Sequence, residues 1–287
     1  MSAGWLESFF TAVGLPKLAY HWQALLFATL ACNFTVGFSR IISPILFPKT
    51  YKQLSDLKRL SWDIHVVSLV HSVAITALSA PLLFDETLLK DKVFGYDEYA
   101  GNVYAIACGY FLWDSLVSLY YVKAFGVGFV VHGASCFGVY LFAYRPFLNY
   151  YGAAFLMFEL STPFLNLHWF MDKVGATGSL LQFFRNTSYW LCPNNVHLLL
   201  ILTCTVVLSV TVLPVIDRVP IFLQVIYGGA NVILNTLNVF WFFKMLNSAS
   251  RRFPKSGQPI PPKADIKDTI SSGESWEDFK TNGKKND

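Results

Sequence analysis

The sequence predicts an all-α, polytopic membrane protein with about seven transmembrane helices. Three observations favour this class. The chain of 287 residues is 54% hydrophobic and only 14% charged, whereas soluble domains carry about 25% charged residues. Its apolar runs approach about 20 residues, the length of a helix that crosses a bilayer. Polar residues inside these runs recur at steps of three or four, which is the spacing of one helical face.

Seven apolar runs are candidates for spans. They are residues 22–46, 62–84, 101–122, 126–144, 148–171, 195–215 and 220–246. A shorter aromatic stretch at 179–191 contains Arg185 and fits an interfacial helix better than a span. The segment 248–287 is polar and contains Pro, Gly and Ser, so it predicts a disordered tail.

Basic residues in the loops predict the orientation. Lys49, Lys52, Lys58 and Arg59 follow the first predicted span, and the tail is also basic. Cytosolic loops carry the excess of Lys and Arg in membrane proteins. The sequence therefore predicts a lumenal N-terminus and a cytosolic C-terminus.

Charge and cysteine usage narrow the possible partners. The net charge of +4 is small and scattered, which argues against a nucleic-acid partner. The five cysteines show no CxxC pattern and fit apolar packing residues, so no metal site is predicted.

The chain ends in "KKND". Lys284 and Lys285 resemble a dilysine signal that retrograde coat proteins read on a cytosolic tail. The resemblance predicts a multi-pass protein of the endoplasmic reticulum membrane, with these coat proteins as partners.

Asp114, His132 and Glu159 are ionisable residues inside predicted spans, and they are the candidate catalytic residues. Such groups are costly at membrane depth and usually face a bundle interior. A rise of about 1.5 Å per residue places Asp114 and His132 roughly 10–12 Å from the cytosolic surface, with Glu159 deeper. Antiparallel helices could bring all three into one layer. Pro163 leaves the carbonyl of Glu159 without its helical donor, which predicts a kink there.

Other polar residues in the spans are candidates for lining the same interior. The candidate lipid- or substrate-binding residues are His71, Ser135, Thr162, Asn166, Asn231 and Asn235. For Ser, Thr and Asn, hydrogen bonding between helices is the alternative interpretation.

Three segments resemble the TLC domain shared by TRAM translocon proteins, ceramide synthases and small TLC-domain-containing membrane proteins. They are "DSLVSLYY" (114–121), "FVVHGASC" (129–136) and "FELSTPFLNLHWF" (158–170). The resemblance implies a domain at 57–247, preceded by a segment at 1–56 with the first transmembrane helix and a basic loop. It also implies that six helices form a barrel-like bundle around a lipid-accessible cavity.

The resemblance to ceramide synthases covers only half of each motif pair. His132 matches the second histidine of their pair, and Glu159, 27 residues later, matches the first acid. Val131, Thr162 and Asn166 depart from the family pattern. In ceramide synthases this constellation is associated with N-acylation of a sphingoid base by acyl-coenzyme A.

Two functions of different classes follow. The first is a non-catalytic role in lipid homeostasis, in which the bundle binds an acyl lipid and membrane lipids are the partners. The second is acyl transfer without a bound cofactor, with acyl-coenzyme A as co-substrate. There His132 acts as general base or nucleophile and Asp114 or Glu159 orients it. A membrane cargo adaptor or transporter is a further alternative.

Overall fold

The computed structural model describes residues 3–175 and 205–252, and these residues form helices. The α-helices are α1 (Ala3–Ala12), α2 (Trp22–Leu46), α3 (Pro48–Tyr51), α4 (Asp56–Ser79), α5 (Glu86–Lys90), α6 (Glu98–Tyr120), α7 (Val122–Phe125), α8 (Val127–Phe142), α9 (Asn149–Leu156), α10 (Thr162–Val174), a helix at 205–212, and α13 (Ile221–Arg252). The 3-10 helices are η1 (Pro16–Tyr20), η2 (Ala80–Phe84), η3 (Met157–Ser161) and η4 (Leu213–Arg218).

Within the described residues, three helices are long and apolar enough to cross a membrane. They are Trp22–Leu46, Asp56–Phe84 and Glu98–Tyr120, and they match the first three predicted spans. The fourth predicted span corresponds to α8, which has only 16 residues, and the seventh lies within α13. The predicted interfacial stretch, residues 195–204 of the sixth predicted span and the tail beyond Arg252 lie outside the described residues.

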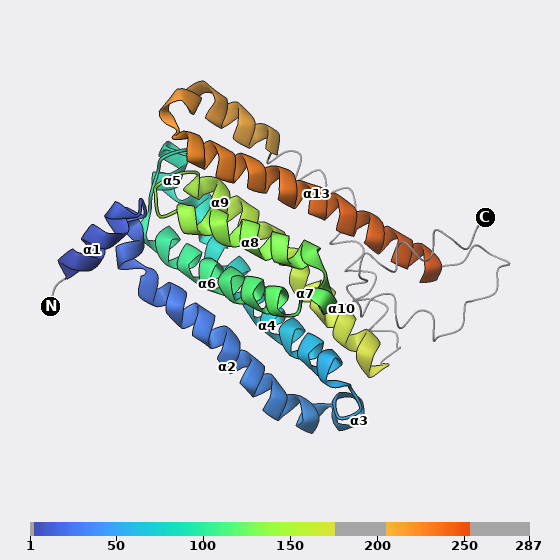
Figure 1. Cartoon of the computed structure of the whole chain (residues 1–287). Coiled ribbons are helices and arrows are strands. Elements are labelled where there is room, and N and C mark those ends of the chain that lie inside the picture. The colour runs from blue at the N-terminus through green and yellow to red at the C-terminus, as the bar shows by residue number, and fades with distance from the viewer. Residues whose placement is uncertain (1–2, 176–204, 253–287) are drawn as a thin grey trace.

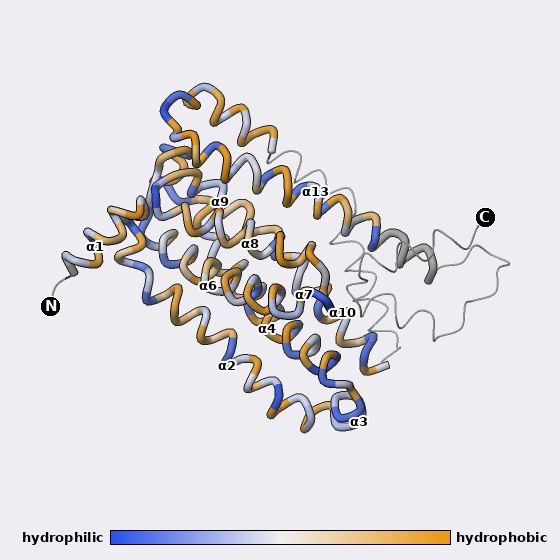
Figure 2. Tube along the Cα trace, in the orientation of Figure 1, coloured by the Kyte–Doolittle hydropathy of each residue, from blue (hydrophilic) through white to orange (hydrophobic). Residues whose placement is uncertain are grey.

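Helix α6 lies at the centre of the bundle (Figure 1). It packs against α2 on one side and α8 on the other, and α13 packs on the outer side of α8. Helix α4 and the α9–η3–α10 segment pack against each other and complete the bundle. Apolar residues dominate these helices, and hydrophilic residues gather around α3 (Figure 2). This arrangement places α6 and α8 side by side at the bundle interior.

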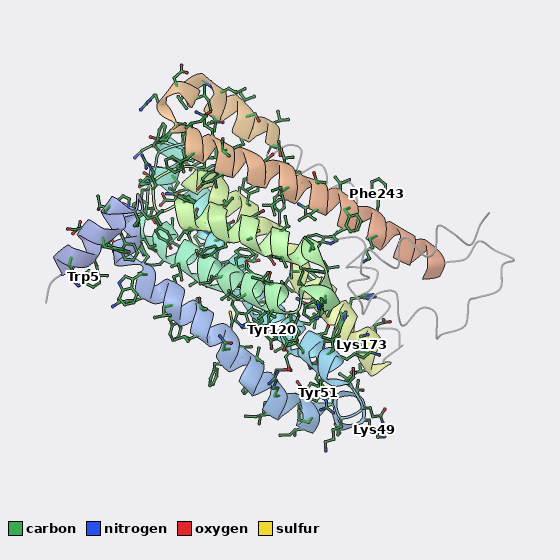
Figure 3. All side chains as sticks on the ribbon, in the orientation of Figure 1. Trp5, Lys49, Tyr51, Tyr120, Lys173 and Phe243 are labelled. Atoms are coloured by element: carbon green, nitrogen blue, oxygen red, sulfur yellow. The ribbon has the colours of Figure 1, made fainter. Side chains whose placement is uncertain are left out.

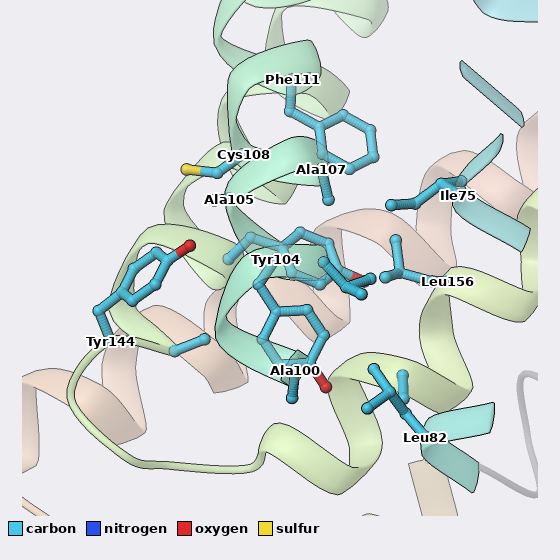
Figure 4. Close-up of a cluster of buried hydrophobic side chains, with 14 of the residues drawn as sticks. Ile75, Leu82, Ala100, Tyr104, Ala105, Ala107, Cys108, Phe111, Tyr144 and Leu156 are labelled. Atoms are coloured by element: carbon cyan, nitrogen blue, oxygen red, sulfur yellow. The ribbon is translucent and has the colours of Figure 1, made fainter. Parts of the chain in front are cut away.

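Small residues allow the close packing of α6. A Cβ atom at Gly109 would collide with the carbonyl oxygen of Leu25 in α2. The hydroxyl of Thr29 donates a hydrogen bond to the Gly109 carbonyl at 3.1 Å. Around them, α6 contributes several alanines and Tyr104 to the main core (Figure 4). In a membrane, where helices gain little from hydrophobic burial, such backbone approach is a main source of helix association.

The helix that begins after Leu148 is interrupted where the sequence predicted a kink. It changes from α9 to the 3-10 segment η3, which contains Glu159, and resumes as α10 with Pro163 in its first turn. The regular helix is thus interrupted at Glu159, at the position where the kink was predicted. The physical cause of this interruption is the missing N–H of Pro163, which cannot donate to the Glu159 carbonyl.

A buried carboxylate joins α2 and α3 to α4. Asp63 is fully buried and accepts hydrogen bonds from Ser39 Oγ at 2.6 Å, Tyr51 Oη at 3.0 Å and Arg40 Nε at 3.1 Å. The Arg40 side chain stays 60% exposed, so its charge reaches the surface while Nε pairs with Asp63. Burial, together with the neighbouring Asp63 carboxylate, raises the pKa of Tyr51 to about 12.

The two ends of the bundle differ in composition. Lys49, Tyr51 and Lys173 lie at one end, and Trp5 in α1 lies at the opposite end (Figure 3). The end with Lys49 is the one that the loop charges predict to be cytosolic.

Candidate functional site

The three predicted site residues come from α6, α8 and the α9–η3–α10 segment. The carboxyl groups of Asp114 and Glu159 interact electrostatically with each other. Both also interact electrostatically with the Cys136 thiol of α8 and with the Tyr110 hydroxyl, one turn before Asp114. The two acids are therefore close enough to interact, and a common layer that also includes His132 stays a prediction.

Asp114 reaches the backbone of α8 beside His132. A Cβ atom at Gly133 would lie 2.9 Å from Asp114 Oδ2, 2.8 Å from Ser115 Oγ and 3.2 Å from the Ser115 nitrogen. Real Cβ atoms essentially never come closer than 3.0 Å to a heavy atom of a residue that is not their neighbour in the chain. Glycine at this position thus allows α8 to approach α6, and Asp114 lies against Gly133, the residue that follows His132.

Aromatic rings surround the imidazole of His132. Its centroid lies 5.2 Å from the Trp241 ring of α13 and 6.3 Å from the Phe111 ring of α6. Its Nε2 lies 3.9 Å from Cys136 Sγ. Its Nδ1 is buried and has no hydrogen-bond partner among the residues that the structure describes. One ring nitrogen is thus left unsatisfied inside the bundle.

A second imidazole lies on the other side of the same aromatic group. His71 is buried in α4 and stacks on Tyr110, with ring centroids 3.7 Å apart. It also contacts Phe111, at 6.0 Å between centroids. Its Nε2 is buried without a partner in the described part of the chain. Phe111 therefore contacts both histidines, one from α4 and one from α8.

Two of the predicted binding residues on α10 have partners. The Thr162 hydroxyl bonds to the Glu159 carboxyl, so it supports an acid of the site directly. Asn166 is buried and donates from Nδ2 to Ser68 Oγ of α4 at 3.0 Å. Ser68 in turn bonds to Tyr110. Asn166 thus positions the site through Ser68 and holds α10 against α4.

The remaining predicted binding residues lie on α8 and α13. Ser135 is half-buried, three residues after His132. Asn235 donates from Nδ2 to Asn231 Oδ1 at 3.0 Å and to Thr205 Oγ1 at 3.1 Å. These contacts join α13 to the helix at 205–212, which supports the interpretation as interhelical hydrogen bonds for Asn231 and Asn235.

Two residues of the site, Trp241 and Phe111, were not predicted from the sequence. They flank His132, but both lie in apolar runs whose aromatic residues could equally face lipid. No signal in the sequence separates these two uses. In the described residues, no group of three or more His, Cys, Asp or Glu could hold a metal ion.

The fold and the site define a helical membrane protein whose bundle holds carboxyl and imidazole groups in its interior. Residues 61–247 match the family model of the TLC domain. The chain belongs to the TLC domain family. This membership indicates a membrane lipid-related role.

Similar proteins occur in fungi and vertebrates. The chain is 37% identical over 256 residues to an uncharacterized TLC domain-containing protein of Schizosaccharomyces pombe, with 86% of this chain and 85% of the relative covered. It is 29% identical to topoisomerase I damage affected protein 4 of Saccharomyces cerevisiae, with 77% and 79% covered. It is 30% identical to TLC domain-containing protein 4 of Xenopus tropicalis, with 74% and 85% covered. No solved structure matches the chain.

Proposed function

We propose that this protein acts in membrane lipid homeostasis and binds an acyl lipid inside its helical bundle, with the polar end of the lipid at Asp114, His132 and Glu159. This proposal includes a barrel-like bundle of six helices after the first of seven spans. The acyl chain extends among the aromatic side chains of the interior.

The unpartnered Nδ1 of His132 carries the proposal. A buried polar atom without a partner costs about 1–3 kcal/mol, and ionisable residues at membrane depth usually mark a ligand pathway or a cavity. A polar group of a bound lipid would satisfy this nitrogen. His71 Nε2, unpartnered on the other side of Phe111, offers a second position for the same ligand.

The partial exposure of the three site residues supports the same proposal. Asp114, His132 and Glu159 are half-buried rather than sealed, although each belongs to a helix or segment packed within the bundle. Fully packed interiors leave few voids. The partial exposure of these three residues is consistent with a ligand that reaches them between the helices, although the His132 Nδ1 atom itself is buried.

Mass spectrometry of lipids co-purified with the protein tests this proposal. His132→Phe keeps an aromatic ring between Phe111 and Trp241 but removes the hydrogen-bonding nitrogens. We expect about tenfold less bound lipid, since one hydrogen bond contributes about 1.5 kcal/mol. His65→Phe is the matched control. His65 stacks on Trp169 at 3.9 Å between centroids, and its Nδ1–H donates to the Ser61 carbonyl. Equal lipid content in wild type and His132→Phe would contradict the proposal.

Acyl transfer is the alternative, and the same unpartnered imidazole nitrogen favours it. As general base, His132 would take a proton from an amine while the amine nitrogen bonds to the thioester carbon of acyl-coenzyme A. The carbon–sulfur bond then breaks, and coenzyme A leaves as the thiol with that proton. Such catalysis contributes about 10²–10⁴-fold to a rate. The purified protein, incubated with acyl-coenzyme A and a long-chain amine, would then form amide, and His132→Phe would lose at least about 100-fold. Lipid binding without any amide product would contradict this alternative.

We also propose that the protein resides in the endoplasmic reticulum membrane with its C-terminus in the cytosol. Lys284 and Lys285, which lie outside the described residues, would bind retrograde coat proteins. The double variant Lys284→Ala, Lys285→Ala should move the protein to later compartments, while the single variant Lys280→Ala serves as the control. Unchanged location of the double variant would argue against a retrieval signal.

A further inference from the structure

Helix α1 presents three different sides. Successive residues of a helix turn by about 100°, so Leu6 and Phe10 share one side, and Phe10 packs against the main core. Trp5 and Phe9 share a second side and are 63% and 52% exposed. Thr11 lies about 200° from Phe9 around the helix and is exposed. The second side is therefore apolar and unpartnered, although the first side is already packed.

The polar side of α1 includes Glu7, which has a fixed contact. The hydroxyl of Tyr20 donates a hydrogen bond to Glu7 Oε1 at 2.7 Å. Backbone contacts hold the segment that follows α1. The Leu15 N–H donates to the Phe10 carbonyl at 2.7 Å, and the Lys17 N–H donates to the Tyr144 carbonyl at 3.1 Å. The orientation of the exposed aromatic side is thus set by contacts to the bundle.

The position of α1 corresponds to the edge of a bilayer. The first apolar span begins at Trp22, ten residues after α1 ends at Ala12. Near this end, Lys17 Nζ lies 4.9 Å from the centroid of the Tyr96 ring, and the Arg145 guanidinium lies 5.0 Å from that of Phe222. Aromatic rings paired with cations are typical of the headgroup level. Helix α1 also runs across the direction of α2 and α6 rather than along it (Figure 1).

Exposed apolar side chains are also found on α2. Leu26, Phe27 and Leu30, in the first turns of α2, are exposed within a helix that is long and apolar enough to span the membrane. Trp5 lies at the same end of the protein (Figure 3). Exposed apolar side chains therefore lie both on α1 and on the first turns of α2, at the same end of the protein.

We infer that α1 is an interfacial membrane helix that binds the phospholipid surface at the end of the bundle opposite Lys49. Trp5 and Phe9 enter the boundary between headgroups and acyl chains, Leu6 and Phe10 hold the helix to the bundle, and Thr11 faces water. Helices of this kind lie in the membrane plane with their apolar side buried in that boundary. This inference does not depend on the ligand proposed for the bundle interior.

Photo-crosslinking of the full-length chain in phosphatidylcholine vesicles tests the inference. Benzoylphenylalanine replaces Phe9 in one variant and Thr11, on the opposite side of the same helix, in the matched control. A third variant carries it at Phe34 of α2, which is 75% exposed and serves as the lipid-facing reference. After irradiation, mass spectrometry counts phospholipid adducts on each variant.

The expected result is a yield of lipid adducts at position 9 comparable to that at position 34, and several-fold lower at position 11. Equal lipid yields at positions 9 and 11 would overturn the inference. Adducts at position 9 that join two copies of the chain, in place of lipid adducts, would overturn it as well, since they would show that a second copy covers this side.

Discussion

Replacing Gly133 with alanine tests how closely α8 must approach α6 at the candidate site. The added Cβ would lie 2.8 Å from Ser115 Oγ and 2.9 Å from Asp114 Oδ2. The Ser115 and Asp114 side chains must therefore move, and the Ser115 backbone nitrogen, 3.2 Å from the added Cβ, leaves α8 little room to stay in place. Overpacking of this kind costs about 1–3 kcal/mol, while alanine gains up to about 1 kcal/mol over glycine from helix propensity.

Gly138→Ala is the matched control for Gly133→Ala. Gly138 lies in the same helix, and a Cβ there would meet nothing within 4 Å. Both variants share the gain in helix propensity. The difference between their free energies of unfolding therefore gives the steric cost, about 1–3 kcal/mol. Thermal unfolding in detergent should give a lower midpoint for Gly133→Ala than for Gly138→Ala. Gly133→Ala should also retain less co-purified lipid, because Asp114 is displaced. If Gly133→Ala proved as stable as Gly138→Ala, the close contact between α6 and α8 would be refuted.

Two further predictions concern the buried carboxylate between α2 and α4. Asp63→Ala should destabilise the protein by about 3 kcal/mol, because it leaves the hydroxyls of Ser39 and Tyr51 without their acceptor. Arg40→Gln should destabilise it by less than about 1 kcal/mol, since Arg40 is largely solvated. Equal thermal unfolding midpoints for these two variants would contradict this assignment. The pKa of Tyr51 is about 12 in the folded protein against 10.0 ordinarily, so the unfolded chain loses its proton first and stability falls between about pH 10 and pH 12. Tyr51→Phe should lose less stability than wild type across that interval, and a parallel decline in both proteins would count against the burial of the phenol.

Run length predicts the first three membrane-spanning helices, which the structure confirms. The first predicted span, 22–46, has the same bounds as α2, because a predominantly apolar run of helical length defines it. The break near Glu159 was also predictable, since Pro163 removes a specific backbone donor. The proximity of Asp114 and Glu159 followed from helical rise and antiparallel order alone.

Contacts between helices were not predictable from one sequence. The spacing of polar residues fixes which of them share a face, but not which neighbouring helix that face meets. Asp63 and Arg40 belong to different helices, and nothing in either segment indicates that Asp63 also binds Ser39 and Tyr51. The contact of Trp241 with His132 joins residues 109 positions apart and has no sequence signal of its own. Asn231 and Asn235 bond to each other and to Thr205, and the sequence did not indicate that Thr205 is their partner.

The location of a bound lipid inside the bundle is the most direct test of this account. A fatty acyl probe with a photoreactive diazirine near its carboxyl end can be incorporated into cellular lipids, crosslinked in the membrane and mapped by peptide mass spectrometry. If the lipid binds inside the bundle, adducts form on the interior segments around Asp114 and His132 and are lost in His132→Phe. Adducts confined to the lipid-facing residues of α2, such as Phe27 and Phe34, and unchanged in His132→Phe, would contradict binding inside the bundle.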